Sequence, residues 1–543
     1  MGSDPIFLAL PVALPLLAGA LLVIVERRGA SWAWPIAFGV VLVLLALAAH
    51  FVARAGSGAV DVLLVGNWRV PFGIALAVDR LSALMLVLTA IVGLAGLLYA
   101  RGGDAQRGEH FHALFMLQLA GLNGAFLTAD LFNLFVFFEV LLIASYGLLL
   151  HGGGAARLKA SIHYVVFNLT GSALFLIAVA ALYGLTGTLS MADLAVRVPQ
   201  LAPDATLLIR AAALLLLVVF CVKAALLPLY FWLPDTYGAA TAPVAAVFAI
   251  MTKVGVYAVA RMYTLVFGDA GGFAANVAVP WLPVLAMATL ALGAAGALAA
   301  AKLRTLIAYL VVASAGTLLL SLGLGTEGAV AAGLFYLIHS TLFAAAFFLL
   351  VDRVTAARGA TEDVLVPAKF GVSPAALGAG FFVVGVAAAA LPPSAGFFGK
   401  ALLLQSAVET PFAAWVWAVV LLSSFAMIVA VARAGSIVFW KPAPATEVTR
   451  QPRKARTEKP APGMVTVTGN PGAVPNAFVH HAAVLLLVAS LGVNAFFAGP
   501  IAAYTEAAAR QLFTPTEYVD AVLGAQPVAP RYRLRDVWPT PDK

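Results

Sequence analysis

The dominant pattern along the 543-residue chain is a series of long apolar stretches separated by short polar segments. A helix of about 20 apolar residues crosses the hydrocarbon core of a bilayer, which is roughly 30 Å thick. The pattern therefore predicts an all-α, polytopic membrane protein with about fourteen transmembrane helices. The predicted spans are 5–25, 32–52, 81–99, 112–128, 131–150, 162–185, 206–229, 243–267, 281–300, 306–324, 328–351, 376–403, 412–440 and 480–497.

Three connecting segments have a distinct character. Residues 62–78 are half polar and rich in aromatic residues and glycine, which predicts a short β-like or interfacial loop. Residues 441–478 are rich in Pro, Lys, Arg and Thr, a composition typical of a flexible linker. Residues 502–513 have the pattern of a short amphipathic helix, and neither the linker nor this helix carries a recognisable chemical motif.

The composition agrees with a membrane protein, because 63% of the residues are hydrophobic and 10% are charged. A soluble domain has about 45–50% apolar and about 25% charged residues. The net charge of +8 comes from basic residues scattered in short loops, so we expect no nucleic-acid partner. The single cysteine, Cys221, excludes an internal disulfide. No phosphate loop, haem ligand pair, catalytic triad or metal-spaced cluster occurs, so we expect no cofactor, no metal and no enzyme of the soluble type.

The distribution of Lys and Arg among the loops predicts the orientation. Odd-numbered loops hold 18 of these residues and even-numbered loops hold 6, the latter including Arg261. Since basic loops stay in the cytoplasm, the odd-numbered loops are expected there and both termini on the outer side.

Four ionisable residues lie deep inside predicted spans. They are Glu139, Lys223, Lys253 and Lys400. A lysine at the bilayer centre costs roughly 2.5–3.5 kcal/mol on insertion scales, so such residues are usually functional. We expect Glu139 to pair with Lys223, and we interpret the lysines as sites that take up and release a proton. The alternative is that these charges only brace neighbouring helices.

Helix-breaking residues accompany two of these lysines. Pro228 follows Lys223 by five residues, and Pro392 and Pro393 come shortly before Lys400. Broken helices at corresponding places in two halves are typical of transporter repeats. The two lysines are 177 residues (400 − 223) and five spans apart, and an odd number of spans makes the repeats inverted. The pattern predicts two half-channels that meet at the membrane midplane.

Weaker candidates surround the buried charges. His339, Ser340 and Thr341 lie in the middle of a span, where a neutral imidazole could relay protons between Lys253 and Lys400. A structural histidine explains the same position equally well. His163, at the start of the sixth span, and Asp235, which we expect as an outer-side helix cap in the proline-rich corner, are possible accessory residues.

Three stretches together resemble a known family of antiporter-like proton-channel subunits. They are DLFNLFVFFEVLLIASYGLLLHGG, LPLYFWLPDTYGAATAPVAAVFAIMTKVGVYAVAR and LPPSAGFFGKALLLQ. The family is shared by the L, M and N chains of respiratory complex I and by the multisubunit monovalent cation/proton antiporters of the Mrp, Pha or Mnh type. The resemblance is greatest to the D-type component of these antiporters and covers roughly residues 5–440. Relatives often carry histidine near Tyr230 and Tyr237, where this chain has tyrosine.

The resemblance implies a fold, site roles and partners. It implies about fourteen helices with two inverted five-helix repeats, divided into helices 1–3 (1–105), the first repeat (106–270), the second repeat (271–440), a linker (441–478) and the last helix with its tail (479–543). It also implies a Glu139–Lys223 gate, a central relay at Lys253 and an exit at Lys400. The implied partners are subunits of the A, B, C, E, F and G types, protons, and Na⁺ or K⁺, in a bacterial inner membrane.

Three functions remain open on the sequence. The first is a subunit of a monovalent cation/proton antiporter, in which a proton passes Glu139, Lys223, Lys253, His339 and Lys400 in a line along the membrane. The second is a proton-pumping chain of an NADH:quinone oxidoreductase or related hydrogenase, with the redox chemistry in a partner. The third is a scaffold subunit without transport of its own.

Overall fold

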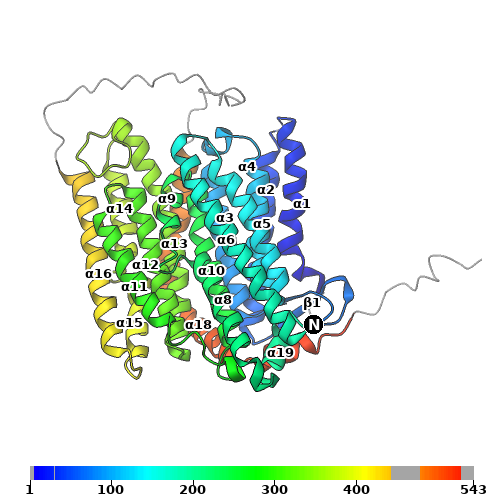
Figure 1. Ribbon diagram of the computed structural model, residues 1–543. Helices are drawn as coiled ribbons and strands as arrows, with labels where there is room; N and C mark the ends of the chain where they lie inside the picture. Colours follow the sequence, from blue (N-terminus) through cyan, green and yellow to red (C-terminus); the bar gives the residue numbers. More distant parts are fainter. Residues whose placement is uncertain (1–4, 30, 442–476, 528–543) are drawn as a thin grey trace, which may run out of the picture.

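The computed structural model describes residues 5–29, 31–441 and 477–527, which form a broad bundle of roughly parallel and antiparallel helices (Figure 1). Among the described residues, 12 helices are long and apolar enough to cross a membrane. They are α1 (Leu10–Arg27), α2 (Ala33–Gly56), α3 (Arg80–Ala100), α5 (Leu131–Leu150), α6 (Ala155–Thr186), α8 (Thr206–Ala224), α10 (Ala242–Leu265), α11 (Leu282–Ala299), α12 (Leu303–Gly323), α13 (Glu327–Arg358), α16 (Ala413–Gly435) and α17 (Ala477–Phe496).

Shorter helices complete the bundle and cover its ends. They are α4 (Phe111–Leu127), α7 (Met191–Arg197), α9 (Trp232–Ala239), α14 (Ala375–Ala388), α15 (Ala395–Ala407), α18 (Ala498–Phe513) and α19 (Thr516–Leu523). Every predicted span coincides with helical structure, and twelve of them meet the length and composition of a membrane crossing. The fourth predicted span is the 17-residue helix α4, and the twelfth is divided into α14 and α15. The all-α membrane fold is confirmed, and the count of fourteen stays a prediction.

The centre of the bundle is formed by α10, α12 and α13. The apolar window of α10 is entirely buried, and those of α12 and α13 are 89% and 94% buried. By contrast, the outer helices α1, α2 and α16 keep exposed apolar side chains such as Leu17, Val43 and Phe425. This distribution suits a bundle whose outer surface meets lipid or other apolar helices.

Two helical segments are broken inside the bundle. The first consists of α8 and α9, and the second of α14 and α15. In Figure 1, α8 lies below α9, whereas α14 lies above α15, so the two broken segments run in opposite directions through the bundle. Both breaks were expected from the prolines at 228, 392 and 393.

One end of the bundle carries the small sheet and the C-terminal helices. Strands β1 (Asp61–Leu64) and β2 (Ala75–Val78) form an antiparallel hairpin in which Asp61 pairs with Val78. Helix α18 lies across α3, α10 and α13, and α19 contacts α7 and β1. The predicted β-like segment 62–78 and the predicted amphipathic helix 502–513 are therefore confirmed. Apart from its ends, the predicted linker 441–478 lies outside the described residues.

The first and last described elements lie at this same end. The 3-10 helix η1 (Pro5–Leu8) contacts β1, as α19 does. This agrees with two termini on one side of the membrane, and the assignment of that side as the outer one stays a prediction.

Candidate functional site

Glu139 and Lys223 contact the same face of helix α6, each through a different residue. The Oγ of Ser172 donates a hydrogen bond to Glu139 Oε1. The Nζ of Lys223 donates to Asn168 Oδ1 at 3.2 Å. Since Asn168 and Ser172 are four residues apart, they share one face of α6.

The expected direct ion pair between Glu139 and Lys223 is therefore wrong for this structure. No salt bridge joins the two side chains in the part of the chain that the structure describes, and each instead bonds to a neutral side chain of α6. The two charges differ in burial, because Lys223 is 8% exposed whereas Glu139 is only partly buried at the edge of the bundle. Sequence spacing predicts how deep a residue lies in its span but not which neighbouring helix it faces.

The helix break places Lys223 in the last turn of α8 instead of the middle of a long helix. Helix α8 ends at Ala224, and Ala225 follows with a left-handed backbone (φ 58°). The polar groups that the break releases find partners: Trp232 Nε1 donates to Val222 O at 3.2 Å, and Leu227 N donates to Thr289 Oγ1 at 2.9 Å. Irregular backbone at membrane depth is tolerated where it is satisfied in this way.

Close packing fixes the break against helix α10. A Cβ atom added at Gly255 would lie 2.5 Å from the main-chain N of Ala224. Only a glycine allows α10 to approach the end of α8 this closely. The approach brings the segment that carries Lys223 next to the helix that carries Lys253.

Lys253 lies near the middle of α10, as expected, and is completely buried. Its Nζ donates to Ser314 Oγ of α12 at 3.1 Å and to Thr252 Oγ1 at 3.2 Å. Both partners are hydroxyl groups, which can accept a hydrogen bond from an ammonium and donate one to a neutral amine. The site therefore keeps its contacts in either protonation state of the lysine.

Lys400 and His339 both lie beside the second break, with different partners. Lys400 lies in α15, is 6% exposed, and donates to Ser424 Oγ of α16 at 3.0 Å. His339 of α13 is 1% exposed, and its Nε2 lies 2.8 Å from the carbonyl oxygen of Ala387 in the last turn of α14. The Nδ1 atom of His339 is buried and has no hydrogen-bond partner. The imidazole thus touches the broken segment and has one nitrogen available.

The neighbours of His339 do not contact the lysines. Ser340 Oγ and Thr341 Oγ1 both donate to Leu337 O of their own helix, at 3.1 Å and 2.8 Å. Both hydroxyl groups are therefore hydrogen-bonded within α13, a common arrangement for serine and threonine in membrane helices.

His163 and Asp235 lie away from the buried lysines. Both line a cavity of about 650 Å³ that also includes Arg157 and Arg304. Residues of the odd-numbered loops line this cavity, so Asp235 lies on the side predicted to be cytoplasmic, which does not agree with its expected outer-side position. Asp235 lies in the first turn of α9 and does not cap it, since the N-cap position makes no side-chain hydrogen bond. The corner that carries Asp235 joins the seventh and eighth predicted spans and is itself an odd-numbered loop, so the outer-side expectation did not fit the predicted orientation.

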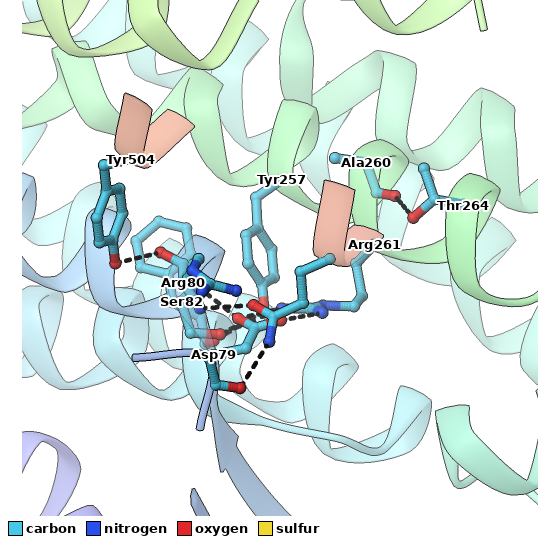
Figure 2. A network of polar contacts seen from close by, with 11 residues as sticks. Asp79, Arg80, Ser82, Tyr257, Ala260, Arg261, Thr264 and Tyr504 are labelled. Carbon is cyan, nitrogen blue, oxygen red and sulfur yellow. Dashed lines mark hydrogen bonds and ion pairs between the residues drawn. The ribbon is translucent and has the colours of Figure 1, made fainter. Parts of the chain in front are cut away.

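A second polar cluster was missed by the sequence reasoning (Figure 2). Arg261, counted there as a loop charge, lies in α10, is 3% exposed and forms a salt bridge with Asp79 at 2.6 Å. The partners of the lysines, Asn168, Ser314 and Ser424, were also missed. Their only signal in the sequence is a small polar residue inside an apolar stretch, which is common in membrane helices.

Comparison with known proteins gives consistent matches. A family described as "NADH:quinone oxidoreductase/Mrp antiporter, TM" matches residues 128–428. The chain is 40% identical to the D component of a probable K⁺/H⁺ antiporter from Rhizobium meliloti, with 95% of this chain and 97% of the relative covered. It is 34% identical to the D component of an Na⁺/H⁺ antiporter from Alkalihalophilus pseudofirmus, with 95% and 98% covered. A chain in the structure of the Mrp complex from a Dietzia species superposes with a TM-score of 0.81 at 30% identity, over 96% of this chain and all of that one.

Proposed function

Because the chain belongs to the NADH:quinone oxidoreductase/Mrp antiporter family of membrane proteins, we propose that it works as the D-type component of a multisubunit monovalent cation/proton antiporter. The observation that carries this proposal is the match, over nearly the whole length of both chains, to relatives named as D components of antiporters. The protein is a multi-pass membrane protein, and its transported cation is Na⁺ or K⁺, the ions that occur in the names of those relatives.

The proton path in this proposal follows Glu139, Lys223, Lys253, His339 and Lys400. The elements that carry them form a continuous series of contacts, from α5 through α6 to α8, then to α10, α13 and α15. Each lysine is bonded to a neutral oxygen instead of a carboxylate. A charge that is not locked into an ion pair can respond to its neighbours, so protonation of one lysine disfavours protonation of the next.

The two breaks support an internal repeat. Ala225 and Ala390 both adopt left-handed backbone at the end of their first half-helix, and each is followed by a leucine whose N–H bonds five residues back. These alanines are 165 residues (390 − 225) apart, and the broken segments run in opposite directions (Figure 1). We assign residues 106–270 and 271–440 to inverted repeats on this basis.

The position of the lysines within these repeats differs from the simple sequence argument. Lys223 comes two residues before its left-handed alanine, whereas Lys400 comes ten residues after the corresponding Ala390. The two lysines therefore occupy opposite sides of equivalent breaks. Each broken segment contributes one lysine, and the two lysines come from different half-helices, α8 and α15.

The partners in this proposal are the A-, B-, C-, E-, F- and G-type subunits in a bacterial inner membrane, with both termini on the outer side. The partly exposed Glu139 agrees with a neighbouring subunit, because a carboxylate is costly against lipid. The family description also covers NADH:quinone oxidoreductase, the second candidate function. A purified complex that contains flavin or iron–sulfur clusters would favour that second function.

The proposal is tested by antiport in everted membrane vesicles. We expect Glu139→Ala, Lys223→Ala and Lys253→Ala each to abolish cation-dependent proton movement while the complex still assembles. Lys302→Ala is a matched control, because this lysine is exposed in a loop, and it should transport normally. Normal antiport in any of the three variants would remove that residue from the path. Retained transport after combined substitution of Lys223 and Lys253 would instead favour a scaffold.

A further inference from the structure

The buried salt bridge at the end of α10 has an unusually complete set of contacts. Arg261 donates from Nη1 to Asp79 Oδ2 at 2.6 Å and from Nη2 to Asp79 Oδ1 at 2.8 Å (Figure 2). Asp79 Oδ1 also accepts from the main-chain N–H of Ser82 at 2.9 Å, as the N-cap of α3. The side chains of Arg261 and Asp79 expose 3% and 2% of their surface. Such a two-point pair is among the strongest that side chains form.

This pair neither accepts nor releases a proton. An arginine guanidinium stays protonated in proteins. Burial alone would raise the pKa of the Asp79 carboxyl, but Arg261 and the Ser82 N–H hold that pKa below its ordinary value. Neither side chain of the pair can therefore take up a proton on one side and release it on the other.

Arg261 lies on the same helix as Lys253, between that lysine and one end of the bundle. Lys253, Tyr257 and Arg261 follow one another at intervals of four residues along α10, which spans about 12 Å from the lysine to the arginine. The hydroxyl of Tyr257 donates to Phe126 O at 2.8 Å and lies 3.5 Å from Arg261 Nη2. A line of polar groups thus leads from the buried lysine toward the end of the bundle where β1 and β2 lie, and it ends at Asp79.

The C-terminal helices cover this end point. The guanidinium carbon of Arg261 lies 4.8 Å from the centre of the Tyr518 ring on α19. Helix α18 is held beside it through Arg80, whose carbonyl oxygen accepts from Tyr504 at 3.1 Å and whose N–H donates to Gln511 at 3.2 Å. The amphipathic segment that the sequence left without a role is thereby attached to the polar cluster.

We propose that the Asp79–Arg261 pair, covered by Tyr518, is a proton barrier that insulates Lys253 from the membrane face on which α18 and α19 lie. The inference rests on the proposed function, because it presumes that protons reach Lys253. Asp79 and Arg261 are positioning residues here: they hold that face closed, and protons do not bind to them during transport. Antiport needs such a barrier, since a proton that leaks past the path is lost to cation exchange.

The test measures passive proton leak, in vesicles that contain the assembled complex and no Na⁺ or K⁺. Arg261→Gln leaves Asp79 buried without its cation, faced by Arg80 and by Tyr257, Tyr504 and Tyr518. A buried carboxyl without its counter-ion takes up a proton. We expect an imposed pH gradient to decay several-fold faster than in the wild type, and to return to the wild-type rate in the double variant Asp79→Asn, Arg261→Gln.

A second pair of variants tests the cover without touching the salt bridge. Tyr518→Leu removes the ring over Arg261 and should raise the proton leak. Tyr518→Phe keeps the ring, so its leak should stay close to that of the wild type. Arg510→Gln, which removes only an exposed α18 contact to Glu327, is the control for a general loosening of this helix. If Arg261→Gln fails to assemble, the Tyr518 variants decide the question.

Three results would overturn the barrier. They are a wild-type leak in Arg261→Gln, an equal leak in the single and double variants, and an equal leak in Tyr518→Leu and Arg510→Gln. The proposed function fails by a different result, normal antiport in Lys253→Ala. Adding Lys253→Ala to Arg261→Gln should remove the leak, and a leak that persists there would show that protons bypass the path.

Discussion

Replacing Gly396 with alanine tests the role of His339 without changing any titratable group. Gly396 lies in α15, against the imidazole ring of α13. A Cβ atom at this position would overlap Nε2 of His339 and lie 2.6 Å from Cδ2. Because non-bonded carbon atoms prefer separations of about 3.5–4.0 Å, the ring has to move by about 1 Å. This movement breaks the 2.8 Å contact between Nε2 and the carbonyl oxygen of Ala387.

The size of the effect follows from the contacts that are lost. A hydrogen bond contributes about 1 kcal/mol net, and a buried polar group left without a partner costs about 1–3 kcal/mol. Alanine is more stable than glycine inside a helix, and this offsets the loss by about 0.5–1 kcal/mol. We therefore expect a net destabilisation of about 1–3 kcal/mol, together with antiport as low as that of His339→Ala.

The assays are thermal unfolding of the detergent-solubilised complex and cation-driven proton movement in everted vesicles. Gly378→Ala in α14 is the matched control, because the nearest atom to its added Cβ, on Phe439, is 3.4 Å away. That variant should be as stable as the wild type or slightly more stable, and it should transport normally. Unchanged stability and unchanged antiport in Gly396→Ala would refute both the close approach of α15 to the ring and the relay role of His339.

Three further predictions concern other parts of the molecule. Gly255→Ala should lower stability by about 1–3 kcal/mol in thermal unfolding, since its Cβ would lie 2.5 Å from Ala224 N; an unchanged midpoint would contradict the tight contact at the break. Asn168→Leu removes the acceptor of the Lys223 ammonium, a bond of about 1.5–3 kcal/mol, and should slow antiport several-fold in the assembled complex, whereas full activity would show that this contact is dispensable. Burial raises the pKa of Asp104 from 3.8 to about 6, so the folded state binds the proton more tightly than the unfolded state does. The free energy of unfolding therefore falls by about 3 kcal/mol as the pH rises from below 3.8 to above about 6. Asp104→Asn should abolish that fall in unfolding measured from pH 4 to pH 8, and a wild-type pH dependence would argue against this origin.

The site was partly predictable because membrane depth can be read from sequence. Lys253, Lys223 and Lys400 were placed inside spans by counting residues from the ends of apolar stretches, and the structure buries all three. Arg261 escaped the same reasoning because it lies near the end of its stretch, where an arginine can equally reach the interface. Only its salt bridge with Asp79, from a segment 182 residues away, shows that it is buried.

The sequence by itself determined the class of fold, the position of the helices and the two breaks. Hydropathy and proline act locally, because a run of apolar residues has to cross the bilayer and a proline removes a backbone donor wherever it occurs. Tertiary structure alone decided which helix each polar group faces: Glu139 contacts Ser172 instead of Lys223, and α18 lies across α3, α10 and α13. Those choices depend on the rotation of each helix about its axis, which is set by packing against neighbours that are distant in the sequence.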